Sequence, residues 1–431
     1  MKVLGKKCFW ITIAATVCAC KMNAQTVAID GEFRPRVEYR DGFGAPLSDS
    51  NDPGIFAIQR TRLGATFTSA VLKTQFTIQD SRTYGKTAPS SETATLGVFE
   101  AWAEFLLMPG GSAKVGRQAL TYDDGRLFSA SNWSNTGNSH DLALFKYNVN
   151  DFQAHLGFAY NNTSAISSET VYTNGAKYRY MGLLWLSKGI AKDLTLSAIA
   201  VDEGMQPTTD ATKYGTKVNM NHEYTFGGNL KYGNETKPFS ALATAYFQAG
   251  KNQTGDDLRG SMAAVKLNYK ISSAVTTSLG TDYLSGDDNK TDGKQKNFRK
   301  LYGSNHSFNG SMEYWSTPLS AGLLDYYGSV NAKVSKTTSI EGAFHVFSSS
   351  KDMTSNSQNI GKSLGSELDL CLNYKLNEWS KLQVGWSTYF ANDNTRIAKG
   401  MTADAKTRFP QWGYVMLTVS PSYLKSIFTD K

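Results

Sequence analysis

The feature that most constrains this chain is a repeated alternation of apolar and polar residues with a period of two. Segments of about ten residues show it, separated by polar stretches rich in Gly, Asn, Asp and Ser. Between Ala263 and Ile271 the apolar side chains fall on odd positions, while Lys266, Asn268 and Lys270 fall on even ones. Such a segment is a strand with one apolar face and one face that needs water.

The same pattern recurs in residues 152–160, 367–376 and 381–390. A soluble β-sandwich or a β-helix would show the same alternation, because an antiparallel sheet can have one wet face. Two features favour a membrane barrel instead. The apolar faces are almost free of charge, and aromatic residues stand near segment ends, where barrels place their interfacial girdles: Tyr160, Tyr269, Phe390 and Trp412.

The first 24 residues resemble a secretory signal peptide. Three lysines precede an apolar run over residues 9–19, and residues 22–24 form the expected cleavage region. A retained anchor helix is one alternative, although the run is short for a bilayer, and a lipoprotein acylated at Cys20 is another. After the leader, no apolar stretch reaches eighteen residues. We therefore expect cleavage after residue 24 and a single barrel domain over residues 25–431.

Removal of the leader changes the charge and the cysteine content. The formal net charge of +8 falls to +4, because the leader contains four lysines and no acids. Only Cys371 remains of the four cysteines, so neither an internal disulfide nor a Cys-based metal site is expected. No cluster of Lys and Arg with interleaved aromatics appears, which argues against a nucleic-acid partner. The sequence also indicates no cofactor and no metal site.

Nineteen segments have strand character, but bacterial single-chain barrels have even numbers of strands. The weakest segment, 307–315, has no clean lipid face, so we interpret it as part of a long loop. The prediction is an all-β, 18-stranded antiparallel transmembrane β-barrel of the bacterial outer membrane. Short turns should alternate with long external loops, which are expected at residues 121–139, 161–177, 202–222, 284–306 and 348–364.

Several motifs resemble the alginate-export family of outer-membrane barrels, in the branch found in Bacteroidetes. They extend from about residue 55 to residue 390 and so cover most of the mature chain. The segments that carry the resemblance are Gln59 to Gly64, Gly116 to Gln118, Tyr122 to Leu127, Leu301 to Gly310 and Gly365 to Leu370, with Asn132-Trp133 and His140-Asp141.

The resemblance implies an eighteen-stranded barrel of the Gram-negative outer membrane, with a cation-lined conduit for an anionic polysaccharide. The expected partners are outer-membrane lipids, lipopolysaccharide and an anionic carbohydrate or another small hydrophilic solute. The sequence does not give the oligomeric state. One departure concerns the end of the chain. Outer-membrane strands typically finish on a terminal aromatic, whereas here Pro421 follows the segment 412–419, so either the usual assembly signal is altered or the last strand lies closer to Phe428.

Within this resemblance, Arg60 and Arg62 stand two residues apart and therefore share one face of a strand. Arg117 and Arg126 flank a Gly/Asp turn that would narrow the lumen if it folds inward. Arginine suits an anion conduit because its planar guanidinium pairs with carboxylates and stays charged. The predicted pore-lining residues are Arg60, Arg62, Glu100, Glu104, Arg117, Asp124, Arg126, Lys266, Lys270, Glu367 and Asp369.

On the fourth segment we place Val98, Glu100, Trp102 and Glu104 on one face, opposite Phe99. Acids facing the arginines would keep a conduit from trapping its anion, since conduction needs weak binding at several sites. The alternative is that these charges form interior salt bridges that hold the barrel round.

The function predicted from these observations is a porin-like channel for a hydrophilic, anionic solute, and not an enzyme. No G-x-S-x-G motif occurs, and His222-Glu223 is followed by Phe226 where a zinc-binding helix needs His. Two alternatives stay open. One is a structural or adhesive barrel with a plugged lumen, and the other is an outer-membrane lipase, which would need a Ser/His pair at the lipid-facing rim.

Overall fold

Nearly all of the regular secondary structure in the described residues is β-strand, as the period-two alternation predicts. The computed structural model describes residues 25–86, 95–168, 172, 178–207, 220–234, 236–288, 291–317, 319–355 and 358–426. The predicted leader lies outside these residues, so its cleavage stays a prediction. None of the helices in the described ranges is long and apolar enough to cross a bilayer.

The strands of the main sheet follow one another around a wall in chain order. They are β1 (Thr26–Asp41), β2 (Gly54–Thr68), β3 (Leu72–Thr83), β4 (Leu96–Met108), β5 (Gly111–Gln118), β6 (His140–Val149), β7 (Phe152–Tyr160), β8 (Tyr180–Ala191), β9 (Leu194–Met205), β10 (Asn221–Tyr232), β11 (Phe239–Gly250), β13 (Ser261–Lys270), β14 (Val275–Leu284), β16 (Leu323–Lys333), β17 (Thr338–Ser355), β18 (Gln358–Lys375), β19 (Ser380–Phe390), β20 (Gln411–Val419) and β21 (Ser422–Ser426).

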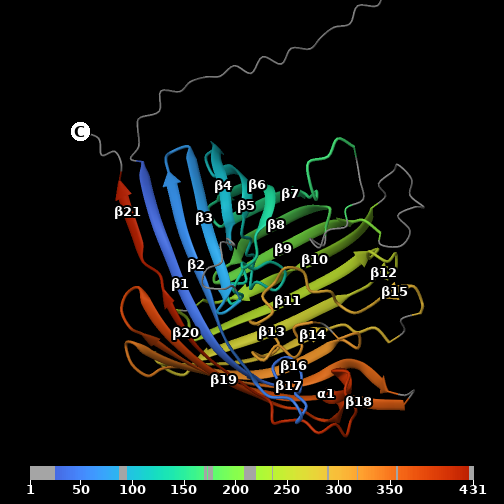
Figure 1. Ribbon diagram of the computed structural model, residues 1–431. Helices are drawn as coiled ribbons and strands as arrows, with labels where there is room; N and C mark the ends of the chain where they lie inside the picture. The colour runs from blue at the N-terminus through green and yellow to red at the C-terminus, as the bar shows by residue number, and fades with distance from the viewer. Residues whose placement is uncertain are drawn as a thin grey trace, which may run out of the picture.

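The wall is closed by pairing of the two ends of the chain. β1 pairs antiparallel with β2 along one edge and with both β20 and β21 along the other. β20 and β21 are one strand interrupted at Pro421, whose carbonyl accepts the Gly31 N–H at 2.9 Å. Figure 1 shows blue β1 beside red β20 and β21. The fold is therefore a closed, antiparallel barrel of eighteen strands, as predicted.

The two ends of the barrel differ. At the short-turn end the hairpins close over residues 69–71, 109–110, 150–151, 192–193, 233–238, 271–274, 334–337 and 376–379. At the long-loop end the connections are residues 42–53, 84–95, 119–139, 161–179, 206–220, 251–260, 285–322 and 391–410. The long loops carry a two-residue parallel pair, β12 (Asp257–Leu258) with β15 (Lys294–Gln295), and the helix α1 (Asp393–Ala398), which Asn392 caps.

One predicted loop is wrong. Residues 348–364 were expected to form a long polar excursion, but β17 runs to Ser355 and β18 begins at Gln358. This hairpin extends past the band of exposed apolar residues, where both faces of a strand can be polar. Its sequence therefore lacks the apolar–polar alternation by which the other strands were predicted. Residues 307–315 contain no strand, as predicted.

The apolar side chains of the wall point outward. On β13, Val265, Leu267 and Tyr269 are exposed on the outer surface, while Met262 and Ala264 are buried on the inner face. The same alternation runs around the barrel, so its outer surface is a belt of exposed Leu, Val, Phe and Tyr. A belt of this kind suits lipid rather than water.

Candidate functional site

Two of the long loops turn into the barrel. The first inward loop, residues 119–139, bonds to Arg34 of β1, Trp185 of β8 and Asp282 of β14. The second inward loop, residues 285–322, bonds to Glu203 of β9 and Glu367 of β18. A segment that touches distant parts of the wall at the same time must cross the lumen.

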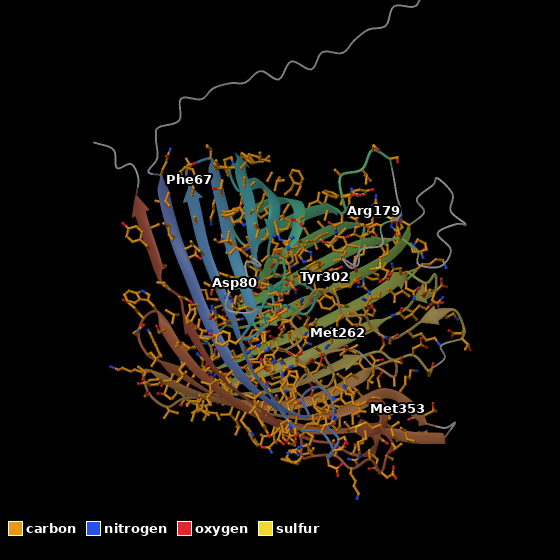
Figure 2. All side chains as sticks on the ribbon, viewed as in Figure 1. Phe67, Asp80, Arg179, Met262, Tyr302 and Met353 are labelled. Atoms are coloured by element: carbon orange, nitrogen blue, oxygen red, sulfur yellow. The ribbon has the colours of Figure 1, made fainter. Side chains whose placement is uncertain are left out.

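The two inward loops are joined to each other. Tyr302 N donates to the Leu127 carbonyl at 2.8 Å, and Ser129 N donates to the Tyr302 carbonyl at 3.1 Å. The Trp133 and His306 rings stack with centroids 3.9 Å apart. Figure 2 shows Tyr302 within the space that the strands enclose. The joined loops form a constriction across the lumen.

The constriction has its own packed core. Apolar side chains of both loops meet inward-facing side chains of the wall in one buried cluster. The loop residues in it include Leu120, Tyr122, Leu127, Phe128, Phe298, Leu301, Met312, Tyr314 and Trp315. Burial of this apolar surface holds the loops inside the barrel.

Five arginines on the inner face of two neighbouring strands define what we call the arginine row. The row is Arg34, Arg36 and Arg40 on β1 with Arg60 and Arg62 on β2. Arg34 lies directly opposite Arg60 in the strand register, and like charges in that position repel. The row therefore needs strong acceptors around it.

Only part of that need is met by carboxylates. Arg60 pairs with Glu32 at 2.5 Å, and Arg36 and Arg40 both pair with Glu38 at 2.8 Å. Arg62 Nε donates to Gln79 Oε1 of β3 at 2.7 Å, and other donors of the row bind backbone carbonyls of the first inward loop. They run from Arg34 and Arg60 to Asn132 and Ser134, from Arg34 and Arg36 to Trp133, and from Arg62 to Thr136.

The second inward loop is held by carboxylates on the other side of the wall. Glu367 of β18 accepts the Met312 N–H at 2.7 Å. Arg299 of the loop pairs with Glu223 of β10 at 2.7 Å and with Glu203 of β9. Thus β1 and β2 present cations to the first loop, whereas β9, β10 and β18 present acids to the second.

Arg126 links the first inward loop to this acidic side. It makes two bonds to Asp282, at 2.7 and 2.8 Å, and one to Asp124 at 2.8 Å. Burial disfavours its charge, but Asp282 and Asp124 raise the pKa of Arg126 above its ordinary value. Arg126 therefore stays charged, as an anchor of the loop.

Two lysines are buried beside the constriction. Lys300 donates to Asn309 Oδ1 at 2.8 Å, and burial lowers the pKa of Lys300 to about 8. Lys399 follows α1, donates to the Tyr314 carbonyl and lies 4.5 Å from the centroid of the Trp315 ring. Burial also lowers the pKa of Lys399 to about 8. Lys300 lies in the second inward loop and Lys399 binds that loop, and in the part of the chain that the structure describes neither lysine is in an ion pair.

A cavity of about 580 Å³ adjoins the constriction on the side of β11 to β20. Its lining includes Asp124 and Arg126 of the first loop, His306 of the second loop and Lys266 of β13. Cys371 of β18 also lines it. The lining combines apolar surface with hydroxyl, amide and charged groups that can bind a hydrated solute.

Seven lysines face the lumen at the short-turn end, each within a few residues of a short turn. We call them the lysine ring: Lys73, Lys231, Lys266, Lys270, Lys333, Lys375 and Lys381. Five strands on one side of the barrel carry six of them, and β3 carries Lys73. Within the described residues none of the seven is in an ion pair. Their charges are free to act on a solute.

The predicted pore residues divide among these features. Arg60 and Arg62 belong to the arginine row, and Lys266 and Lys270 to the lysine ring. The constriction includes Asp124 and Arg126 from its first loop, and Glu367 and Asp369 from the wall that holds its second loop. That any of these residues contacts the solute stays a prediction.

Glu100 and Glu104 face inward, but both are engaged. Glu100 accepts the Ala119 N–H at 3.0 Å, where the first inward loop leaves the wall. Glu104 pairs with Lys146 at 2.5 Å and accepts the Ser112 hydroxyl at 2.6 Å. These two acids have structural partners, which fits the alternative of interior salt bridges.

The predicted faces of β4 are wrong at one end. Val98 is exposed on the outer surface, and Phe99 is buried inside, 3.5 Å beneath the Arg62 guanidinium. A β-bulge opposite Thr77 and Ile78 inserts one residue and exchanges the two faces beyond it. A strict period of two does not reveal such an insertion.

The placement of Arg117 in the pore is also wrong. Arg117 lies opposite Asp141 in the strand register and pairs with it at 2.8 Å. Asp141 is on the same face of β6 as Phe145 and Tyr147, which are exposed on the outer surface. The pair therefore lies on the outside of the barrel, because Gly116, at φ 123°, and not Arg117 has the inward position.

Arg34, Arg36 and Asp282 are site residues that the sequence analysis missed. Arg34-Pro35-Arg36 has the same two-residue spacing as Arg60 and Arg62, and that spacing was the available signal. Nothing marks Asp282, since a single acid in an alternating strand is common. In the described ranges no group of three or more His, Cys, Asp and Glu side chains is arranged to hold a metal ion.

Comparison with known proteins bears on this architecture. Residues 26–408 match the family described as alginate export. No curated protein matches the chain. The solved structures that resemble it are outer-membrane proteins, and at about one-tenth identity the likeness shows the fold alone.

Three of these structures illustrate the likeness. OprD of Pseudomonas aeruginosa is 11% identical, with a TM-score of 0.57 over 92% of this chain and 94% of that chain. OpdK of Pseudomonas aeruginosa is 10% identical, with a TM-score of 0.58 over 92% and 99%. OccAB2 of Acinetobacter baumannii is 12% identical, with a TM-score of 0.59 over 92% and 98%.

Proposed function

The chain belongs to the alginate export family of bacterial outer-membrane barrels, and from this premise we propose that it is a channel for a hydrophilic, anionic solute such as an acidic polysaccharide or oligosaccharide. We infer a transport role rather than a catalytic one. In the outer membrane the short-turn end faces the periplasm and the long loops face outward.

The observation that carries this proposal is the lysine ring. The charges of the constriction are engaged, since its arginines and acids bind each other or the inward loops. The lysines of the ring have no such partners in the described chain. The seven lysines outnumber Glu341 and Asp30, the inward-facing acids near this end that are in no ion pair within the described residues, so the excess charge that a solute meets at the periplasmic mouth is positive.

Lysine suits weak, repeated contact with a polymer. Its ammonium is a strongly hydrated point charge on a flexible stem, so it attracts a carboxylate without holding it in a fixed bidentate geometry. Conduction needs binding at several sites that is weak enough to release. A ring of lysines followed by a polar cavity meets both requirements for an anionic chain.

Reconstitution of the refolded protein in a planar bilayer tests the proposal. Stepwise conductance with a reversal potential that indicates anion preference in a KCl gradient is expected. In the double variant K375Q/K381Q, which removes a pair that lies opposite in the register, the preference should weaken. Lys192→Gln, in an exposed turn, is the matched control. Cation preference of the wild-type channel would reject the anionic solute.

A second candidate function is a structural or adhesive barrel with a plugged lumen. The observation that favours it is the constriction, whose packed core crosses the lumen. The same bilayer experiment separates the two functions, because a plugged barrel inserts without stepwise conductance.

A further inference from the structure

The arginine row carries more positive charge than its carboxylates can neutralise. Its five guanidiniums form ion pairs with two acids, Glu32 and Glu38, and Glu100 adds one more negative charge near Arg62. Both acids are already in ion pairs with the row. The remaining positive charge, held inside the barrel, lies against groups that have no net charge.

Those groups are the backbone carbonyls of the segment Asn132–Thr136. Ser134 O accepts from Arg34 and from Arg60, at 2.9 Å each, and Trp133 O accepts from Arg36 at 3.0 Å. A neutral carbonyl is a weaker partner for a guanidinium than a carboxylate, since charge-assisted hydrogen bonds are roughly twice as strong. The segment accepts hydrogen bonds from the arginine row without neutralising its positive charge.

A solute in the cavity can reach this segment. His306, Trp412 and Tyr414 line the cavity, and all three rings contact Trp133, with centroids 3.9, 5.7 and 5.0 Å away. The other face of the Trp133 ring lies 4.0 Å from the Arg36 guanidinium. Trp133 thus separates the cavity from the arginine row.

Side-chain anchors of the segment are few. Asn135 Nδ2 donates to the Gln59 carbonyl at 3.1 Å, and Ser81 Oγ donates to the Asn135 carbonyl at 2.6 Å. No carboxylate of the segment takes part, because residues 132–136 contain none. A negatively charged acceptor therefore binds each arginine that it reaches more strongly than a backbone carbonyl of this segment does.

From these contacts we propose that the segment Asn132–Thr136 is an internal stand-in for the solute. Its carbonyls occupy the arginine row in the resting channel, and the carboxylates of an acidic oligosaccharide displace them on arrival. The arginines then bind the solute while the first inward loop moves from the row. This inference rests on the proposed function and adds to it where the solute binds inside the channel and which groups it displaces there.

Block of single-channel current by a hexamer of galacturonic acid measures the displacement, with the methyl-esterified, uncharged hexamer as the control probe. In Trp133→Ala the segment loses its stacking contacts, including the one with Arg36, while all five arginines of the row stay in place to bind the hexamer. We expect the charged hexamer to bind roughly tenfold more tightly, because less free energy is needed to displace the segment. Trp386→Ala, on the outer surface, removes a tryptophan as the control and should leave binding unchanged.

A locked channel gives the converse test. The variant S81C/N135C in a C371S background places a disulfide where Ser81 Oγ meets the Asn135 backbone. After oxidation the charged hexamer should no longer bind, and reduction should restore binding. Undiminished binding to the locked channel, or equal affinities of W133A and wild type, would overturn the inference. Anion preference in salt alone depends on the lysine ring, so it fails separately if the proposed function is wrong.

Discussion

The join between the inward loops is testable at Gly303. This residue lies where the backbones of the two loops come closest. A Cβ added there would lie 2.6 Å from the Arg126 carbonyl carbon and 2.8 Å from the Gly125 carbonyl oxygen. Backbone atoms cannot turn aside as a flexible side chain does, so Gly303→Ala must push the loops apart.

The size of the effect follows from the contacts that are lost. Separation weakens two backbone hydrogen bonds, Tyr302 N to Leu127 O at 2.8 Å and Ser304 N to Gly125 O at 3.1 Å. Each contributes about 1 kcal/mol, and overpacking adds about 1 kcal/mol or more. A total of about 3 kcal/mol shifts the ratio of open to closed constriction by roughly two orders of magnitude.

Single-channel recording measures this shift. We expect Gly303→Ala to spend more time at a higher conductance, with the barrel wall intact as judged by its heat-modifiable migration on gels. Gly54→Ala is the matched control, because a Cβ there has no neighbour within 4 Å. A correctly folded G303A channel with wild-type conductance would refute the view that these backbone contacts close the lumen.

Two further predictions concern access and pH. Cys371 lines the cavity, so methanethiosulfonate reagents should modify its thiol. Because the lysine ring favours anions, an anionic reagent should react faster than a cationic one. A folded channel that resists both reagents would contradict the assigned cavity. Lys399 has a pKa of about 8 in the folded state against 10.5 ordinarily, so the unfolded chain binds more protons between these values and stability rises with pH across that window. Urea unfolding should show this rise in wild type and not in K399M, and equal pH dependence of the two would contradict it.

The wall was predictable because its rules are local. Alternation places lipid-facing and lumen-facing residues along each strand, and it identified Lys266 and Lys270 as inward-facing from the sequence alone. It failed where one residue was inserted, at the bulge that places Phe99 inside. The misplacement of Arg117 has another cause, because it came from the family motif and the nearby turn, whereas strict alternation puts Arg117 on the outer face with Val115.

The interior was less predictable for a different reason. The partners of the arginine row are backbone carbonyls, and a carbonyl has no signature in the sequence. The arginine spacing at Arg60 and Arg62 predicts a cationic inner face, but it does not show that residues 132–136 occupy that face. Likewise, nothing local connects Asp282 with Arg126, which is 156 positions away.

The closing seam has a consequence for how the protein is made. Thr26 pairs with Ser426, so β1 can pair along its second edge only after almost the whole chain has been synthesised. Until then β1 has an edge of unpaired backbone groups, which promotes aggregation. Contacts so distant in sequence also form slowly, because the chain between them must first lose its freedom. A chaperone that shields the edge of β1 before closure would therefore set the yield of folded barrel.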